Sequence, residues 1–384
     1  MTNLIDVIEV AESLEGKAVY LVPDRCVVVR NRNASCAKCR EACPVDAVFA
    51  ADNELVLDAG RCVACGACTT VCPTEALIPL EPLDDELAAR AAAAVESSGG
   101  SSVFACARIA SKGVGDPDKY AAVPCLARME ESVLLGLASR RAGDVILVDG
   151  TCSTCKFRAC NPGIDATVAS ANTLIASQGS DTRVRRVSAF PEQVLLEDRR
   201  GLLGASRRGF FAQARDAAKE VAGKSVEVAL KNEHAEQPTL YDRLHLSDAG
   251  TLPQFKPERR MHVLDAMDRL GRSVVPEIDT RLFGNVIIDE SSCSACGMCA
   301  VFCPTGALRK SEVVSEDGAG SYLEFSTAEC VQCNLCADVC LKKSLHVDSV
   351  VSTEELFDFE PRLIHLPDPP ARTGVLAGLK RQGF

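Results

Sequence analysis

Hydrophobic residues in the middle of the chain alternate between short extended runs and helical stripes. Apolar runs of strand length occupy residues 102–107, 121–124, 144–148 and 183–188. Between them, residues 129–139 and 164–177 place their apolar side chains on one face of a helix. Alternation of strands and helices predicts a parallel sheet with helices on its faces, over residues 101–195.

Shorter elements are predicted toward both ends of the chain. Proline and acidic residues open a helix over residues 82–97, and Gly99 follows it. Further helices are predicted in residues 1–25, over residues 207–221 and, with one apolar face, over Met261–Leu270. Short strands are predicted at Val19–Val22, Cys26–Val29, Leu55–Leu57, Val286–Ile288 and Tyr322–Phe325.

Four copies of one cysteine pattern follow these end strands. The spacing C-x2-C-x2-C-x3-C is complete in three copies: Cys62, Cys65, Cys68, Cys72; Cys293, Cys296, Cys299, Cys303; and Cys330, Cys333, Cys336, Cys340. The remaining copy, Cys36, Cys39 and Cys43, has Asn33 in place of its first cysteine. Self-similarity of this kind predicts a repeated structural unit, present twice at each end.

The chain contains 21 cysteines and has a net charge of −11. Its first residues have no basic segment followed by an apolar run, so we expect no signal peptide. No apolar stretch is long enough to span a membrane, which leaves peripheral association open. We therefore expect a reducing, cytoplasmic location, where metal binding by cysteines is favoured over disulfides. The negative charge argues against nucleic acid and suits a basic face on a protein partner.

The spacing is typical of 4Fe-4S cubes that share two motifs, three thiolates coming from one motif and the fourth from the other. Cys26 is the only cysteine upstream of Cys36, and we assign it as the displaced fourth ligand of the first cube. The predicted cubes are held by Cys26, Cys36, Cys39 and Cys72; by Cys43, Cys62, Cys65 and Cys68; by Cys293, Cys296, Cys299 and Cys340; and by Cys303, Cys330, Cys333 and Cys336.

Two alternatives concern these ligands. Cys26 could be a buried free thiol that packs as a small hydrophobe, or the first cluster could have three irons and fewer thiolates. Zinc is disfavoured because zinc ribbons use two ligand pairs separated by a long loop.

Residues 18–80 and 284–349 resemble two-cluster bacterial ferredoxins, which implies a small α+β fold holding two cubes at each end. The chain departs from that family at Asn33 and at Leu341, where proline is usual.

Five further cysteines fall at the ends of the predicted central strands or in the loops after them: Cys106, Cys125, Cys152, Cys155 and Cys160. Crevices at the carboxyl ends of parallel strands are where such sheets place their sites. Crowded thiolates need a cation or a cluster to offset their repulsion. We predict a fifth iron–sulfur centre, 2Fe-2S or 4Fe-4S, on Cys106, Cys125, Cys152 and either Cys155 or Cys160. It would connect the two end modules or face a partner.

The central segment also resembles the small iron–sulfur (delta) subunit of methyl-viologen-reducing hydrogenases. The resemblance rests on Val123–Arg128, residues 134–145 and Val148–Cys155. It implies one additional cluster, and electron transfer between a hydrogenase and a flavin-containing disulfide reductase. The alternative is a thioredoxin-like pair, Cys152 and Cys155, although no helix opens at Cys152 to lower its pKa.

The predicted fold is a multidomain α+β protein in which two ferredoxin-like dicluster modules flank a small parallel α/β domain. Its parts are an N-terminal module (1–82), a linker helix (83–100), the central domain (101–195), a helical tether (196–283), a C-terminal module (284–350) and a tail (351–384).

Three functions are compatible with these motifs. The first is an electron-transfer subunit of an oxidoreductase complex that connects a hydrogenase, flavoprotein or molybdoenzyme to an acceptor. The second is an enzyme that reduces a disulfide or small acceptor at the central cysteines. The third, a cluster carrier or redox sensor, is disfavoured because a carrier needs labile sites. The absence of nucleotide-binding fingerprints favours the first.

Overall fold

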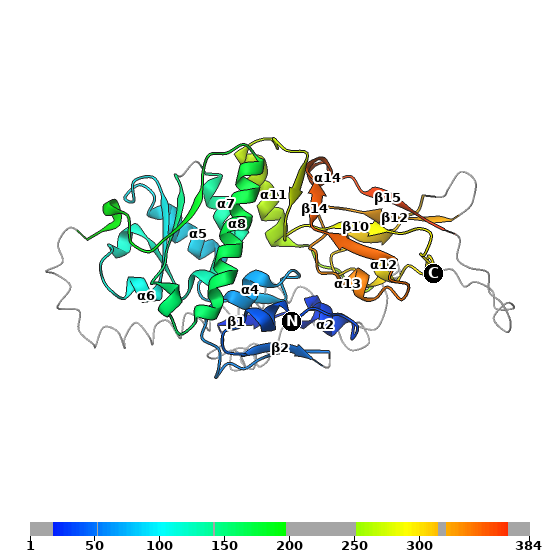
Figure 1. Cartoon of the computed structure of the whole chain (residues 1–384), viewed down its shortest axis with the longest axis horizontal. Helices are drawn as coiled ribbons and strands as arrows, with labels where there is room; N and C mark the ends of the chain where they lie inside the picture. Colours follow the sequence, from blue (N-terminus) through cyan, green and yellow to red (C-terminus); the bar gives the residue numbers. More distant parts are fainter. Residues whose placement is uncertain (1–17, 52, 141–142, 197–250, 314–319, 368–384) are drawn as a thin grey trace, which may run out of the picture.

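The computed structural model describes residues 18–51, 53–140, 143–196, 251–313 and 320–367. The helices predicted in residues 1–25 and 207–221 lie largely or wholly outside these ranges. In Figure 1 the central sheet and its helices lie on the left and the C-terminal module on the right. The N-terminal module, in blue, lies below them and reaches both. The chain therefore mixes helices and strands, with one parallel sheet.

The central domain is built on a four-stranded, fully parallel sheet in the order β6-β5-β7-β8. Every residue of β5 is buried, as expected for a strand covered on both faces. This confirms the parallel sheet predicted from the hydrophobic pattern. The strands are β5 (Ser102–Cys106), β6 (Ala121–Val123), β7 (Val145–Val148) and β8 (Val184–Val187).

Helices cover this sheet and share its apolar core. They are α5 (Asp84–Ala93), α6 (Ala107–Ala110), α7 (Glu131–Ala138), α8 (Asn161–Ser177) and α11 (Glu258–Leu270). Helix α11 was predicted within a tether, and it packs Val263, Leu264 and Met267 into the central core. Single 3-10 turns occur at Pro23–Arg25, Pro117–Lys119, Leu126–Arg128, Cys152–Thr154, Arg158–Cys160 and Glu192–Val194.

Two antiparallel strand pairs frame the N-terminal module. Strand β1 (Val19–Leu21) pairs with β4 (Leu77–Pro79), and β2 (Val48–Ala51) forms a hairpin with β3 (Glu54–Leu57). The short helices are α2 (Val27–Arg30), α3 (Lys38–Ala42) and α4 (Ala67–Val71).

The strand predicted at Cys26–Val29 is wrong, because this segment enters helix α2. Its valines favour a strand by propensity, but propensity is a weak prior that tertiary packing overrides. The helix buries Val27 against Leu335 and Val339 of the C-terminal module, and this contact between modules is invisible in the local sequence.

The C-terminal module repeats the antiparallel design and extends it. Strand β10 (Asn285–Ile288) pairs with β13 (Leu345–Asp348), and β9 (Glu277–Asp279) pairs with β14 (Val350–Ser352). Part of the predicted tail joins this module, because β15 pairs with β12. The remaining elements are β11 (Leu308–Lys310), β12 (Ser321–Phe325), β15 (Arg362–Leu366), α12 (Met298–Phe302), α13 (Leu335–Asp338) and α14 (Thr353–Phe357).

The two end modules contact each other directly. The backbone N–H of Ser35 donates to Asp338 Oδ2 at 2.7 Å, and the Ser35 hydroxyl bonds the same carboxylate at 3.0 Å. The central domain therefore does not need to bridge the two end modules. Its place between them in the chain order had suggested such a bridge. Among the described residues, no helix has the length and apolar character needed to cross a membrane.

Candidate metal centres

Each complete cysteine loop contains residues in the left-handed backbone region. Three of the loops place two such residues around their second cysteine: Ala64 and Gly66, Ala295 and Gly297, and Gln332 and Asn334. In all four copies, a residue three positions after the last cysteine also has positive φ: Asp46, Glu75, Gly306 and Lys343. Non-glycine residues adopt this conformation at a cost and cluster at functional sites. The repeat is thus a repeat of backbone geometry as well as of sequence.

This geometry aims polar hydrogens at the cysteine sulfurs. The N–H of Ala47 donates to Cys43 Sγ at 3.2 Å, and the N–H of Ala76 donates to Cys72 Sγ at 3.3 Å. In the C-terminal module, Leu308 N–H donates to Cys303 Sγ at 3.5 Å, and the Ser344 hydroxyl lies 3.4 Å from Cys340 Sγ. Hydrogen bonds to cluster thiolates tune reduction potentials, so these loops suit thiolate ligands.

The first predicted ligand set converges in the N-terminal module. Cys26 is only 8% exposed, and burial together with Cys72 and Cys36 raises the pKa of its thiol. Burial and the neighbouring charges of Cys72, Cys26 and Cys36 raise the pKa of Cys39 to about 12. The four thiols therefore lie close enough for their thiolates to repel one another. Cys26 occupies the place expected of the displaced ligand.

The second predicted set lies beside the first. The pKa of Cys68 is raised, mainly by burial and to a lesser extent by the neighbouring charges of Cys65, Cys62, Cys39 and Cys43. Burial also raises the pKa of Cys62, with Cys65 and Cys43 among its charged neighbours. Cys43, Cys62, Cys65 and Cys68 thus form a second thiol group, and Cys39 adjoins it from the first.

The C-terminal sets line two apolar cavities. One is lined by Cys293, Cys296, Cys299 and Cys340, together with Ile288, Leu345 and Leu366. The other is lined by Cys303, Cys330, Cys333 and Cys336, together with Val286, Phe325 and Val347. Burial, more than the neighbouring thiols, raises the pKa of Cys299 and of Cys330 to about 12. Each cavity thus presents four thiols in an apolar shell.

These groups fit an iron–sulfur cluster on observations of the protein itself. Buried thiols that repel one another lose their protons only when a cation offsets the charge, and metal binding supplies that cation. Among the described residues, no three His, Cys, Asp or Glu side chains converge in the way that a single metal ion requires. Four thiols around a cavity suit a larger, multinuclear group.

The groups follow one another through the two end modules. Cys299 is a charged neighbour of Cys336 within the C-terminal module, and Cys36 is one of Cys333 across the junction between modules. Within the N-terminal module, Cys39 is a charged neighbour of Cys68. Each of the four groups therefore has a cysteine close to a cysteine of the next.

The central cysteines extend this series. The Cys160 thiol lies beside Cys125 and beside Cys65, a member of the second N-terminal group, and its single S–H can donate to either sulfur. This interaction raises the pKa of Cys160 and lowers the pKa of Cys125 to about 7. Sequence spacing predicted a site among the central cysteines but gave no sign of its contact with Cys65.

The remaining central cysteines are Cys152, Cys106 and Cys155. Burial raises the pKa of Cys152 while the Arg186 guanidinium lowers it, and Cys125 is a charged neighbour. Cys106 ends β5, and Cys155 closes the turn that begins at Cys152. The structure therefore gives Cys125 two cysteine neighbours, Cys152 and Cys160.

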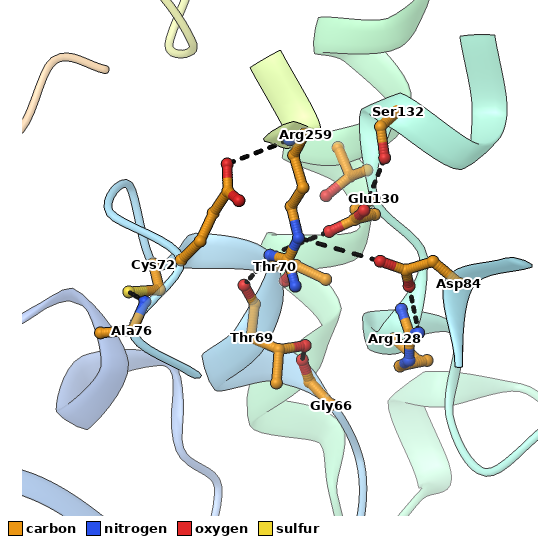
Figure 2. A network of polar contacts seen from close by, with 12 residues as sticks. Gly66, Thr69, Thr70, Cys72, Ala76, Asp84, Arg128, Glu130, Ser132 and Arg259 are labelled. Atoms are coloured by element: carbon orange, nitrogen blue, oxygen red, sulfur yellow. Dashed lines mark hydrogen bonds and ion pairs between the residues drawn. The ribbon is translucent and has the colours of Figure 1, made fainter. Parts of the chain in front are cut away.

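A buried arginine fastens the N-terminal module to helix α11. Arg259 Nη1 donates to the carbonyl oxygen of Thr69 at 2.7 Å, and its backbone N–H donates to Glu75 Oε1 at 3.1 Å (Figure 2). Thr69 lies in α4, directly after Cys68, and Glu75 follows Cys72. The arginine thus holds the loops that carry two predicted ligands.

The same arginine binds carboxylates of the central domain. Figure 2 shows Arg259 between Glu130, at 3.0 Å, and Asp84, at 3.8 Å, while Arg128 pairs with Asp84 from the other side. Burial raises the pKa of Glu130 to about 8, although Arg259 opposes the shift. Ser132 donates to Glu130 at 2.5 Å. The network joins three segments that are distant in sequence.

Gly66 is predicted to be irreplaceable at the contact between the second thiol group and the central domain. Its φ is +75°, and an added Cβ would lie 2.6 Å from Arg128 Cδ and 2.9 Å from Arg128 Cα. We expect Gly66→Ala to destabilise the chain by about 2–5 kcal/mol, from backbone strain and overpacking together. Thermal unfolding midpoints measured anaerobically would check this. Gly136→Ala is the control, because nothing lies within 4 Å of its Cβ in helix α7. An equal loss in both variants would contradict the prediction.

Two family models match the chain. Residues 292–344 match the model of the 4Fe-4S dicluster domain, and residues 55–78 match that of the 4Fe-4S binding domain. The chain therefore carries 4Fe-4S ferredoxin-type domains near both of its ends. No curated protein matches the chain. The resemblance of the central domain to hydrogenase delta subunits stays a prediction.

Proposed function

We propose that this chain is a multi-cluster electron-transfer subunit of a larger oxidoreductase complex. Iron–sulfur domains already indicate an electron-transfer role. The observation that carries the finer proposal is the continuous series of thiol groups. It runs from the C-terminal module, across the junction where Cys333 and Cys36 pack against one apolar cluster, through the N-terminal module to Cys160 and Cys125. Adjacent redox groups in a row are what a relay requires.

The chain would hold four 4Fe-4S clusters on the four thiol groups and a fifth centre around Cys125, Cys152 and Cys160. When bound, such clusters accept and release single electrons. The protein supplies the thiolates, the N–H donors to sulfur and the apolar shells that exclude water. Because the series ends at the central domain, we place one contact with a partner there. The other contact lies at the module that holds Cys296, the one cysteine exposed in the described structure.

The partner proposed here is a hydrogenase, a flavoprotein or a molybdoenzyme. The chain's net charge of −11, before any cluster is added, suits a partner with a basic docking face. Association should then slow as salt rises, because steering by charge is screened. Co-purification of redox subunits with the native chain would support this. Turnover of a substrate by the isolated chain, without any partner subunit, would count against a role as a subunit of a complex.

Chemical analysis gives the direct test of cluster content. The chain purified anaerobically should contain about sixteen iron and sixteen sulfide atoms on its end modules, because each cube holds four of each. Iron and sulfide assays together with low-temperature paramagnetic resonance of the reduced protein would measure this. A preparation that transfers electrons with zinc in place of iron would refute the proposal.

The alternative function is a thiol-dependent reductase at the central cysteines. It is favoured by one observation, the Cys125 pKa of about 7, because thiolates are the reactive form of cysteine. In that case Cys125 and Cys160 would form a disulfide and give two electrons and two protons to the substrate. Two electrons from the end-module clusters, with two protons from water, would then restore the two thiols.

The two functions differ in what Cys125→Ala should do in the full chain. In the relay, the variant loses the iron of the fifth centre and keeps the four end clusters. In the reductase, its iron content is unchanged, and a reversible disulfide found in the unmodified chain is missing. Iron assays and thiol titration at controlled potential separate these outcomes.

A further inference from the structure

Arg30 lies at the junction of the two end modules with part of its guanidinium unpartnered. It ends helix α2, and its Nη1 donates to the carbonyl oxygen of Pro253 at 2.7 Å and to that of Asp24 at 3.2 Å. Nε and Nη2 are buried, and neither has a hydrogen-bond partner among the described residues. A buried donor left unpaired costs free energy, and more so on a charged group. A purely structural role explains this arrangement poorly.

The Pro253 carbonyl bound by Arg30 lies in a segment fixed beside Cys303 of the other module. Leu252 N–H donates to Val301 at 3.1 Å, and Phe255 N–H donates to Pro304 at 3.0 Å. Burial lowers the pKa of Arg30, and the thiolates of Cys303 and Cys333 oppose this more strongly than Asp24 does. Both cysteines belong to the same C-terminal thiol group. Arg30 thus belongs to the N-terminal module by sequence but lies in the electrostatic field of a C-terminal ligand set.

The surroundings of this junction are apolar. Val27, Leu335 and Val339 form a buried cluster there, with Cys36 and Cys333 packed against it. In such a medium, charges interact several times more strongly than they do in water. An arginine keeps its charge even when buried, because its guanidinium is not deprotonated in proteins. The junction that contains Cys36 and Cys333 therefore also holds a fixed positive charge.

We propose that Arg30 is a positioning residue that raises the reduction potential of the centre held by Cys303, Cys330, Cys333 and Cys336. This rests on the proposed function, since it requires a cluster at those cysteines. Adding an electron makes the centre more negative, so a nearby fixed cation stabilises the reduced state. The two donors without a hydrogen-bond partner leave part of the guanidinium charge available to act on the centre through space. Docking of the two end modules would then set the reduction potential of the centre from which electrons cross from one module to the other.

Potentiometric titration of the full chain, followed by paramagnetic resonance, tests this. Arg30→Gln and Arg30→Met remove the charge, and Met keeps a long side chain for packing. We expect one couple to move to lower potential, with at least a ten-fold change in its reduced-to-oxidised ratio, about 59 mV for one electron. Arg185→Gln is the matched control. Arg185 is exposed and paired with Asp144 in the central domain, so its loss should shift no couple.

Each outcome supports or overturns the proposal. Unchanged couples in a neutral variant that retains all its iron overturn the role of Arg30 and leave the proposed function standing. Absence of any iron–sulfur signal in the unmodified chain overturns both. If both neutral variants lose iron, Arg30→Lys decides. Retention of the clusters by this charged variant supports the electrostatic role, and loss in all three variants shows that Arg30 only packs.

Discussion

Replacing Cys26 with serine should remove one cluster, or convert it to a three-iron form, while the other clusters persist. Cys26 is buried at the N-cap of helix α2, with Cys36 and Cys72 as charged neighbours, so its thiolate completes the first group. Serine is a poor substitute for a thiolate ligand of iron. The loss should amount to about four of about sixteen irons, or to one if a three-iron cluster remains. Iron assays and paramagnetic resonance would measure it.

The same substitution should interrupt the relay at the junction between the end modules. The first group contains Cys36, a charged neighbour of Cys333 across the junction, so electrons that enter the C-terminal module could not continue to the second group. Reduction of the C-terminal clusters should remain fast, while reduction of the second N-terminal cluster should slow severely. Rapid mixing with a reductant, read by freeze-quench resonance, resolves the two events.

Two further variants identify the cause. Cys26→Ala tests the packing alternative, because a small buried hydrophobe tolerates alanine and would leave the iron content unchanged. Val28→Ala, in the same helix, perturbs packing without removing a thiol. If Cys26→Ala retained every cluster and its unchanged resonance spectrum, Cys26 would be a packing residue only, and the first cluster would use three cysteines.

Each cysteine loop could be defined from the sequence because ligand spacing is local. Three cysteines within seven residues define a loop, and the structure places residues with positive φ, Ala295 and Gly297, on either side of Cys296. The fourth ligand of each cube, such as Cys340 in the set with Cys293 and Cys299, was predicted because paired motifs of this spacing exchange their last cysteines. The parallel sheet was predictable as well, because fully buried strands such as Val145–Val148 are continuous hydrophobic runs.

Relations between distant segments were not predictable in this way. Nothing in the spacing of Cys160 indicates that it lies beside Cys65, because that contact depends on how α4 docks on the central domain. Arg30 and Arg259 resemble ordinary surface arginines in sequence. Only the packed structure shows that Arg259 is buried and that two guanidinium nitrogens of Arg30 are buried at a junction. The valines of α2 favoured a strand locally, and the contact with Leu335 decided otherwise.

Replacing Arg259 with methionine should destabilise the chain by about 3–5 kcal/mol, because breaking a buried ion pair from one side leaves uncompensated charge. Glu130 and Asp84 would lose their shared cation, and the Thr69 carbonyl would lose its donor. Lysine should recover only part of the loss, since it cannot reproduce the planar fork of donors. Anaerobic thermal unfolding at one scan rate would rank the variants.

A matched control lies on the same helix. Arg269 Nε donates to the Ser139 hydroxyl at 3.2 Å and forms no part of the buried network, so Arg269→Met should cost only about 1 kcal/mol. Equal losses in the two methionine variants would show that Arg259 contributes no more than an ordinary hydrogen bond.

The pH dependence of the Arg259→Met variant gives a second, independent readout. Burial raises the pKa of Glu130 from 4.5 to about 8, and removal of Arg259 should raise it further. A carboxyl that binds its proton more tightly when folded makes stability fall as pH rises from its unfolded pKa toward its folded pKa. The unfolding midpoint of the variant should therefore continue to fall above pH 8, where the contribution of Glu130 in the unmodified chain levels off. Parallel curves would show that Glu130 does not depend on Arg259, and that the link between the N-terminal module and the central domain lies elsewhere.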